Sequence, residues 1–256
     1  MIGTIAGDII GSVYEGERIK HTDFPLFSAW SRFTDDTALT VATAHALLTG
    51  RPYADAYHDF GRRYPHAGYG GAFRRWLSRN DWMPYGSFGN GSAMRVGPVG
   101  LAMTTMDDVL AEAERSASAT HDHPEGIRGG QAVALATYLA RSGQSKDSIR
   151  LQIERELGYD LSRTLDEIRP TYELDVTCQG SVPEAITAFL ESDSVESAIR
   201  LAISLGGDAD TQAAIAGGIA EAFYGGVPDP LVQEVLGRLP EEFREVIVAF
   251  RARFDE

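Results

Sequence analysis

The spacing of small and apolar side chains predicts helices along most of this chain. Residues 36–49 repeat them at helical intervals, as at Leu39, Ala42, Ala46 and Leu47. Similar patterns cover most of the chain from residue 92 onward, and the expected helices include residues 124–141, 145–157 and 161–168. We find neither strand alternation nor the alternating strand and helix rhythm of a parallel sheet. We therefore expect an all-α fold, a compact helical bundle in a single domain spanning residues 1–256.

The first apolar segment carries three glycines at helical spacing. Gly3, Gly7 and Gly11 lie four residues apart, so on a helix they form one smooth face. Each glycine costs about 1 kcal/mol of helix propensity relative to alanine, and packing must supply the difference. We therefore expect the backbone of another element to approach this face closely.

An acidic stripe occupies a different face of the same segment. Asp8, Ser12 and Glu15 are spaced i, i+4 and i+7, which places them together on a helix. The stripe is either a solvated face or part of a polar site, and the spacing alone does not separate these interpretations.

Two clusters of acids and hydroxyls precede apolar helical runs. Residues 34–37 read Thr-Asp-Asp-Thr, and the second cluster contains Asp208, Asp210 and Thr211. A carboxylate at a helix start can cap the free backbone N–H groups. Clustered carboxylate and hydroxyl oxygens also suit a hard divalent cation such as Mg²⁺. Capping and metal binding both stay open, and the metal hypothesis requires that the two clusters converge in space.

Net charge and cysteine content limit the classes of partner and the cellular compartment that we expect for this protein. The formal net charge of −14 argues against a general nucleic-acid binder and against binding to anionic membranes. One cysteine, Cys178, allows no intrachain disulfide, which fits a reducing cytoplasm. The N-terminus lacks the basic leader of a signal peptide, and no apolar run has the length of a membrane span. We expect a cytoplasmic protein and, in the absence of a feature demanding a dimer, a monomer.

A loop rich in glycine, asparagine and aromatic residues spans residues 80–92. Glycines let a backbone approach a ligand closely, and exposed N–H groups can cradle phosphate. Farther along, His121 and His123 precede a helix, where they could be ligands, a proton-transfer pair or ordinary loop residues.

Five motifs in this order resemble the ADP-ribosylglycohydrolase family, which includes the dinitrogenase reductase-activating glycohydrolase. They are GDIIGSVYEG, TDDT, FGNGSAMRVGPVG, THDHPEGIRGG and GGDADTQAAIAGGIAEAFYG, and together they span residues 7–225. The segment from residue 144 to 179 matches none of these motifs, and we expect it to shape the substrate entrance.

The resemblance implies an all-α bundle with two Mg²⁺ ions in a cleft, or Mn²⁺ in their place. The family's ligand positions fall on Thr34, Asp35, Asp36, Asp208, Asp210 and Thr211. Its gating acid falls on Glu15, and either Glu15 or the ligand Asp35 is expected to move the proton. The residues implied to hold ADP-ribose are Phe88, Gly89, Asn90, Gly91, Ser92 and His121.

The implied function is removal of ADP-ribose from modified protein side chains by cleavage at the anomeric carbon. Arginine is the favoured acceptor and serine the alternative. Two rival hypotheses are a hydrolase of free ADP-ribose derivatives or other nucleotides, and a non-catalytic binding or structural member of the family. The presence of all six ligand residues and of Glu15 favours catalysis.

Overall fold

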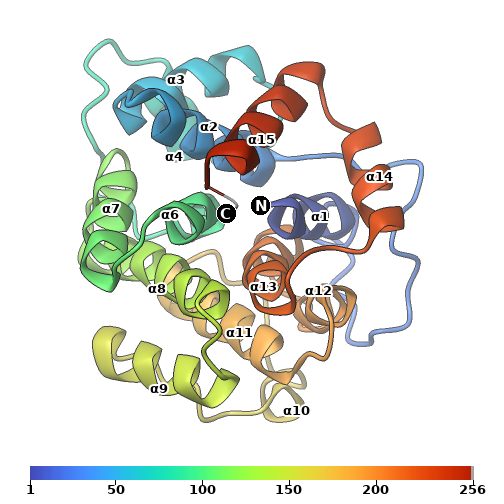
Figure 1. Ribbon diagram of the computed structural model, residues 1–256. Helices are drawn as coiled ribbons and strands as arrows, with labels where there is room; N and C mark the ends of the chain where they lie inside the picture. Colours follow the sequence, from blue (N-terminus) through green and yellow to red (C-terminus); the bar gives the residue numbers. More distant parts are fainter. Residues whose placement is uncertain (255–256) are drawn as a thin grey trace.

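Helices provide the regular secondary structure of the chain between residues 1 and 254, which are the residues described by the computed structural model (Figure 1). Those residues hold no strand beyond an isolated antiparallel bridge between Gly89 and Thr177, so the all-α prediction is confirmed. The fifteen helices of this part of the chain are α1 (Ile2–Gly11), α2 (Asp35–Thr49), α3 (Tyr53–Arg63), α4 (Gly71–Leu77), α5 (Gly91–Met94), α6 (Gly97–Ala102), α7 (Met106–Ser118), α8 (Pro124–Arg141), α9 (Lys146–Leu157), α10 (Leu165–Ile168), α11 (Cys178–Glu191), α12 (Val195–Ile203), α13 (Ala209–Tyr224), α14 (Asp229–Gly237) and α15 (Glu241–Phe254).

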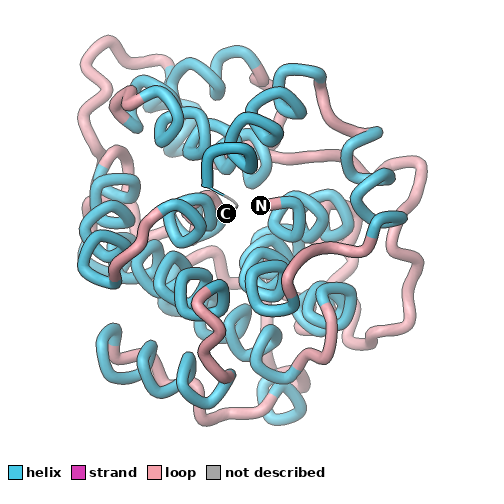
Figure 2. The backbone as a smooth tube through the Cα atoms, viewed as in Figure 1, coloured by secondary structure: helices cyan, strands magenta, loops and turns pink. Residues whose placement is uncertain are grey.

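The glycine face of α1 packs directly on α13. A Cβ atom added at Gly7 would overlap the carbonyl oxygen of Ala213, and one added at Gly3 would overlap that of Gly217. The two helices lie side by side in the middle of the molecule, with the others arranged around them (Figures 1 and 2). The predicted close approach is confirmed, and α13 is the element that makes it.

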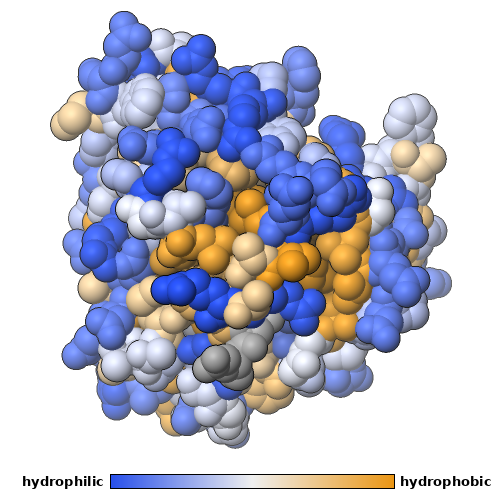
Figure 3. Space-filling model, turned by 45° about the horizontal axis from the view of Figure 1, so that its top comes forward, coloured by the Kyte–Doolittle hydropathy of each residue, from blue (hydrophilic) through white to orange (hydrophobic). Residues whose placement is uncertain are grey.

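Hydrophobic side chains from the central helices form the core. They include Ile9 of α1, Val41 of α2, Leu135 of α8 and Phe189 of α11, all fully buried. On the face drawn in Figure 3, hydrophobic side chains gather near the middle and hydrophilic ones cover the rim. None of the helices within residues 1–254 combines the length and hydropathy required to cross a membrane.

Two helix starts differ from the sequence prediction. Ser181 and Glu184 have the spacing of a capping box, which predicts a helix start at Ser181, but α11 begins at Cys178 because the Thr177 hydroxyl already accepts a hydrogen bond from the Gly180 N–H at 3.1 Å. Asp193 and Glu196 have the same spacing, whereas the residue that caps α12 is Ser194. In each case a neighbouring hydroxyl satisfies the free backbone N–H groups first.

The helix expected over residues 161–168 is shorter than predicted. It is reduced to α10, Leu165–Ile168, which begins at a capping box formed by Thr164 and Glu167. The carbonyl of Leu161 accepts a hydrogen bond from Arg150 at 2.8 Å, so this part of the segment is held by α9 rather than by helical bonds.

Candidate active site

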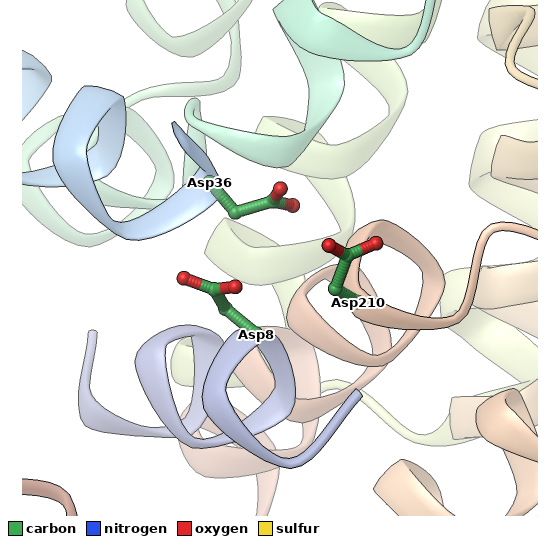
Figure 4. Close-up of side chains that lie close together, drawn as sticks. All are labelled: Asp8, Asp36 and Asp210. Atoms are coloured by element: carbon green, nitrogen blue, oxygen red, sulfur yellow. The ribbon is translucent and has the colours of Figure 1, made fainter. Parts of the chain in front are cut away.

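Three buried aspartates from three helices meet next to the α1–α13 contact. They are Asp8 in α1, Asp36 in the first turn of α2 and Asp210 in the first turn of α13. Figure 4 shows their carboxylates pointing toward one another, and one oxygen from each lies within 4.8 Å of the others. Oxygens of Glu15 and Asp208 approach Asp210 within the same limit. The two acid clusters that lie far apart in sequence therefore converge in space.

Asp8 anchors the start of α2. Its carboxylate accepts hydrogen bonds from the Thr34 N–H at 2.9 Å, the Thr34 hydroxyl at 2.7 Å and the Thr37 N–H at 3.0 Å, and from the Thr37 hydroxyl. The solvated interpretation of the acidic stripe is thus wrong for Asp8, since the free N–H groups at a helix start compensate a buried carboxylate. Sequence reasoning did not include Asp8 in the acidic cluster, although its spacing from Glu15 was the available signal.

Asp208 does not act as a helix cap. It occupies the N-cap position of α13 but accepts no capping hydrogen bond from the helix. Its carboxylate instead accepts a hydrogen bond from the Asn90 side-chain amide at 2.7 Å. The capping interpretation is therefore wrong for Asp208, and its position is set by a residue of the glycine-rich loop.

Gly11 fixes the place of Asp210. A Cβ atom added at Gly11 would lie 2.5 Å from the Asp210 Cα atom. The last glycine of the α1 face thus lets the acidic start of α13 come against the end of α1.

The converging acids other than Asp8 line a cavity of about 220 Å³. All six residues predicted as metal ligands contribute to its wall, and Glu15 and Ser12 do so from the turn that follows α1. Sequence reasoning missed the remaining wall, which had no acidic or periodic signal. It consists of Arg32, His66, Ala67, Gly68, Gly70 and Met94.

Burial and mutual repulsion raise the carboxyl pKa values in this cavity. The pKa of Asp8 rises to about 7 and that of Asp35 to about 8, chiefly through burial and then through the charge of Asp210. The same two causes place the pKa values of Asp36 and Asp208 well above the usual range. At Glu15 the charge of Asp210 is the first cause and burial the second.

The cluster has the chemistry of a divalent-cation site. Its donors are oxygens, its charge is negative, and Asp36 Oδ1 is buried without a hydrogen-bond partner among residues 1–254. A hard cation accepts such oxygens and offsets the repulsion between them.

We expect the stability of the metal-free protein to fall as the pH rises. An aspartate in an unfolded chain has a pKa of about 3.9. Because the folded-state pKa is about 7 for Asp8 and about 8 for Asp35, the folded chain keeps protons that the unfolded chain has released. This contribution is lost as the pH passes through the folded-state values. Thermal unfolding in EDTA should give a lower Tm at about pH 8 than at about pH 5.5, and Mg²⁺ should raise Tm most at the higher pH. A Tm in EDTA that climbs across this range would contradict the account.

The glycine-rich loop lies beside the cluster, and its residues differ in what their side chains contact. Asn90 reaches Asp208, whereas Phe88 is 44% exposed and its ring centre lies 5.3 Å from that of His123. Ser92 is fully buried and donates a hydrogen bond to the Gly126 carbonyl at 2.7 Å. Within the described chain, the cavity wall includes neither residues 88–92 nor His121. Their role in holding ADP-ribose stays a prediction.

The His121 ring faces this loop. Thr120 Oγ1 accepts a hydrogen bond from Arg95 Nη2 at 2.8 Å and lies 2.7 Å from His121 Nδ1. The threonine hydroxyl can donate its hydrogen to Nδ1, an arrangement in which the ring proton of His121 lies on Nε2. A Cβ atom added at Gly91 would lie 3.0 Å from the Nε2 atom, so in this tautomer the ring presents a donor to the loop. Burial, and then the charge of Arg95, lowers the pKa of His121 well below its usual range and keeps the ring neutral.

Replacing Thr120 by valine is expected to change the tautomer of His121. The variant keeps the shape of the side chain but removes the hydroxyl that donates to Nδ1. Nitrogen NMR of ring-labelled histidine should show a new population protonated at Nδ1, with the His121 signal assigned from His121→Gln. Thr137→Val is the matched control, because Thr137 is buried and donates to the Val133 carbonyl within its own helix. Identical His121 spectra for wild type and Thr120→Val would rule out this hydrogen-bond chain.

Comparison of the sequence with models of protein families shows which family this chain belongs to. The family model described as ADP-ribosylglycohydrolase matches residues 1–255, nearly the whole chain. The chain belongs to the ADP-ribosylglycohydrolase family. The family predicted from the five motifs is thereby confirmed.

The chain is similar to proteins that are named as hydrolases. ADP-ribosylhydrolase ARH3 of Bos taurus is 30% identical over 305 residues, covering 88% of this chain and 84% of the relative. ADP-ribosylarginine hydrolase Tri1 of Pseudomonas putida is 25% identical, covering 92% of this chain and 72% of the relative. A solved structure described as an ADP-ribosylglycohydrolase-related protein complex superposes with a TM-score of 0.74 at 28% identity, covering 98% of this chain and 95% of that chain.

The segment without a family motif, residues 144–179, contacts two parts of the candidate active site. The Val176 carbonyl accepts a hydrogen bond from the Asn90 N–H at 2.9 Å. The Tyr172 hydroxyl accepts one at 3.0 Å from Gln212, two residues beyond Asp210. The lining of the acidic cavity, within the residues that the structure describes, includes none of residues 144–179. The segment therefore contacts the glycine-rich loop and the start of α13, and its expected role in shaping the substrate entrance stays a prediction.

Proposed function

We propose that this protein removes ADP-ribose from modified protein side chains by hydrolysing the glycosidic bond at the anomeric carbon, with arginine as the favoured acceptor. The observation that carries the proposal is the convergence of acids from the starts of α2 and α13 and from the turn after α1 on one cavity, in a chain that belongs to the ADP-ribosylglycohydrolase family. A family name alone would not distinguish a catalytic member from a binding member. The unpartnered Asp36 oxygen and the six intact ligand positions favour the catalytic one.

The proposed cofactor is a pair of Mg²⁺ ions, with Mn²⁺ as the alternative. Thr34, Asp35, Asp36, Asp208, Asp210 and Thr211 would hold them, because all six line the same cavity. Bound there, a divalent cation orients substrate hydroxyls and makes hydroxide available near neutral pH.

The side chains of the protein would orient the sugar and move the proton. Glu15 lies at the cavity wall with an exposed side chain, and the charge of Asp210 raises its pKa. A carboxyl group with a raised pKa exchanges protons more readily near neutral pH, and Glu15 or Asp35 would take this role. Asn90 keeps Asp208 turned toward the cavity. Backbone N–H groups of the glycine-rich loop and the Nε2–H of His121 would receive the pyrophosphate oxygens.

The name of one relative supports arginine as the acceptor. Tri1 of Pseudomonas putida is called an ADP-ribosylarginine hydrolase, and its match covers 92% of this chain. ARH3 carries no acceptor in its name, so the acceptor must be tested directly.

Two matched peptides test the proposal, one ADP-ribosylated on arginine and one on serine. We expect release of ADP-ribose with Mg²⁺, no release with EDTA, and faster release from the arginine peptide. Faster release from the serine peptide would overturn the acceptor but keep the chemistry. Cleavage inside the nucleotide, or no release from either peptide, would overturn the glycohydrolase proposal itself.

Replacing Glu15 by glutamine is expected to slow turnover by about 10²-fold or more while ADP-ribose binding is retained. Glutamine keeps the size of the side chain but cannot take up a proton. Single-turnover release and the affinity for ADP-ribose should be measured on the same preparation, with Glu17→Gln as a control in the same turn. Wild-type turnover in Glu15→Gln would leave Asp35 as the proton carrier.

A further inference from the structure

Arginines gather in one part of this acidic chain. Residues 60–80 contain Arg62, Arg63, Arg74, Arg75 and Arg79 and no aspartate or glutamate, although the net charge of the whole protein is −14. The segment covers the end of α3, the connecting loop and α4, which lie in the same corner of the molecule as α2 (Figure 1). The cluster is therefore a local basic surface on a molecule that is otherwise acidic.

Three of these arginines have no carboxylate partner. Arg63 pairs with Asp59 and Glu242, and Arg79 pairs with Asp81. Arg62, Arg74 and Arg75 are exposed and form no ion pair within residues 1–254. We call these three side chains the arginine surface. Unpaired guanidinium groups present planar pairs of N–H donors that match a carboxylate or a phosphate.

Two side chains of the arginine surface, Arg62 and Arg74, border a hollow. A concavity of about 510 Å³ is lined by Arg62, Arg74 and Arg79 together with Tyr69 and Asn80. Tyr69 is 2% exposed, and its buried hydroxyl has no hydrogen-bond partner among the described residues. Because this hydroxyl is buried, the guanidinium groups give the hollow its polar character, and their positive charge suits an anionic ligand.

One loop separates this hollow from the candidate active site. His66, Ala67, Gly68 and Gly70 line the acidic cavity, whereas Pro65 and Tyr69 line the arginine hollow. Gly68 has a φ of +102°, and a Cβ atom added there would lie 3.4 Å from Asp35 Oδ1. A chain entering the acidic cavity from this side therefore passes the arginine surface.

We propose that the arginine surface binds acidic side chains next to the modified residue of the protein substrate. This inference rests on the proposed function, because the modified residue must enter the acidic cavity. A short acidic segment stays within the Debye length of the surface, about 8 Å at physiological salt. A long polyanion such as a nucleic acid would extend over the rest of this acidic molecule and be repelled. Charge complementarity therefore favours an acidic peptide.

The arginine surface would contact the acidic side chains of the substrate equally in the bound state and in the transition state. Uniform binding of this kind lowers KM without raising kcat. Charge pairs at the rim of an interface also act mainly on the association rate and are screened by salt. The arginine surface is thus a determinant of substrate preference and takes no part in bond cleavage.

Two arginine-modified peptides test the proposal, one flanked by aspartates and glutamates and one by serines and glycines. The wild type should prefer the acidic peptide by about fivefold to tenfold in kcat/KM at low salt, through KM. The triple variant Arg62→Gln, Arg74→Gln, Arg75→Gln should lose the preference with kcat unchanged. A control triple variant, Arg115→Gln, Arg155→Gln, Arg163→Gln, makes the same charge change at exposed positions elsewhere and should retain it. An unchanged preference in the first variant would overturn the proposal.

A binding measurement separates failure of this inference from failure of the proposed function. Fluorescence anisotropy of the labelled acidic peptide without ADP-ribose needs no turnover. Weaker binding by the arginine-surface variant than by the control variant supports the inference even if neither modified peptide is cleaved. Equal binding by both variants overturns it, and so does tighter binding of a single-stranded oligonucleotide than of the peptide.

Discussion

Replacing Asp36 by asparagine is expected to reduce turnover by about a thousandfold or more and to leave the helical fold intact. Asp36 lies close to Asp8 and Asp210 in the buried cluster, and its Oδ1 atom has no partner among residues 1–254. Asparagine keeps the shape but removes the charge, so a cation that uses this oxygen loses a ligand. Lewis-acid stabilisation of a transition state is worth several kcal/mol, and each 1.36 kcal/mol is about tenfold in rate.

In the absence of metal, Asp36→Asn is expected to stabilise the fold, although it lowers turnover. Burial and the charge of Asp210 raise the Asp36 pKa, which means that its ionised form is disfavoured in the folded chain. The asparagine variant should therefore have a higher Tm than wild type in EDTA, and Mg²⁺ should raise its Tm less. Asp107→Asn is the control, since Asp107 is an exposed aspartate in the first turn of α7. Wild-type turnover in Asp36→Asn, with a wild-type response to Mg²⁺, would refute the metal site.

Replacing Gly7 by alanine is expected to destabilise the fold by about 3 kcal/mol or more. A Cβ atom at this position would overlap the backbone of α13 at Ala213, and backbone cannot move aside as a flexible side chain can. Overpacking in a core typically costs about 1–3 kcal/mol, and a clash with backbone belongs at the upper end. Because α1 carries Asp8 and α13 carries Asp210, separating the helices should also weaken the response to Mg²⁺.

A glycine in open space provides the control. Gly237 is the last residue of α14, and no atom lies within 4 Å of a Cβ added there. Gly237→Ala should leave stability unchanged or raise it by up to about 1 kcal/mol. Denaturant unfolding of both variants gives the comparison, and equal stability of Gly7→Ala and wild type would show that α1 and α13 do not pack through this face.

The candidate site was predictable in part. Acids and hydroxyls before apolar runs indicated Thr34, Asp36, Asp208 and Asp210, and the structure brings them to one cavity. Whether they bind metal stays a prediction. The wall residues of the loop after α3, such as His66, carried no signal, because a loop residue has neither periodicity nor a characteristic neighbour. Ser92, predicted to hold ADP-ribose, has its hydroxyl bonded to Gly126 in the interior.

The positions of most helices were predictable from local spacing, because side chains three and four residues apart lie on the same face of a helix. The expected helix over residues 124–141 has the same bounds as α8, and the three glycines of α1 indicated that another backbone would approach. Only the tertiary structure decided that α13 is the partner and that Asp8 supports the start of α2. It also showed that Asp208 accepts a hydrogen bond from Asn90 and does not cap α13. These outcomes depend on contacts between residues far apart in the chain, where desolvation and repulsion act, and no spacing within one segment encodes them.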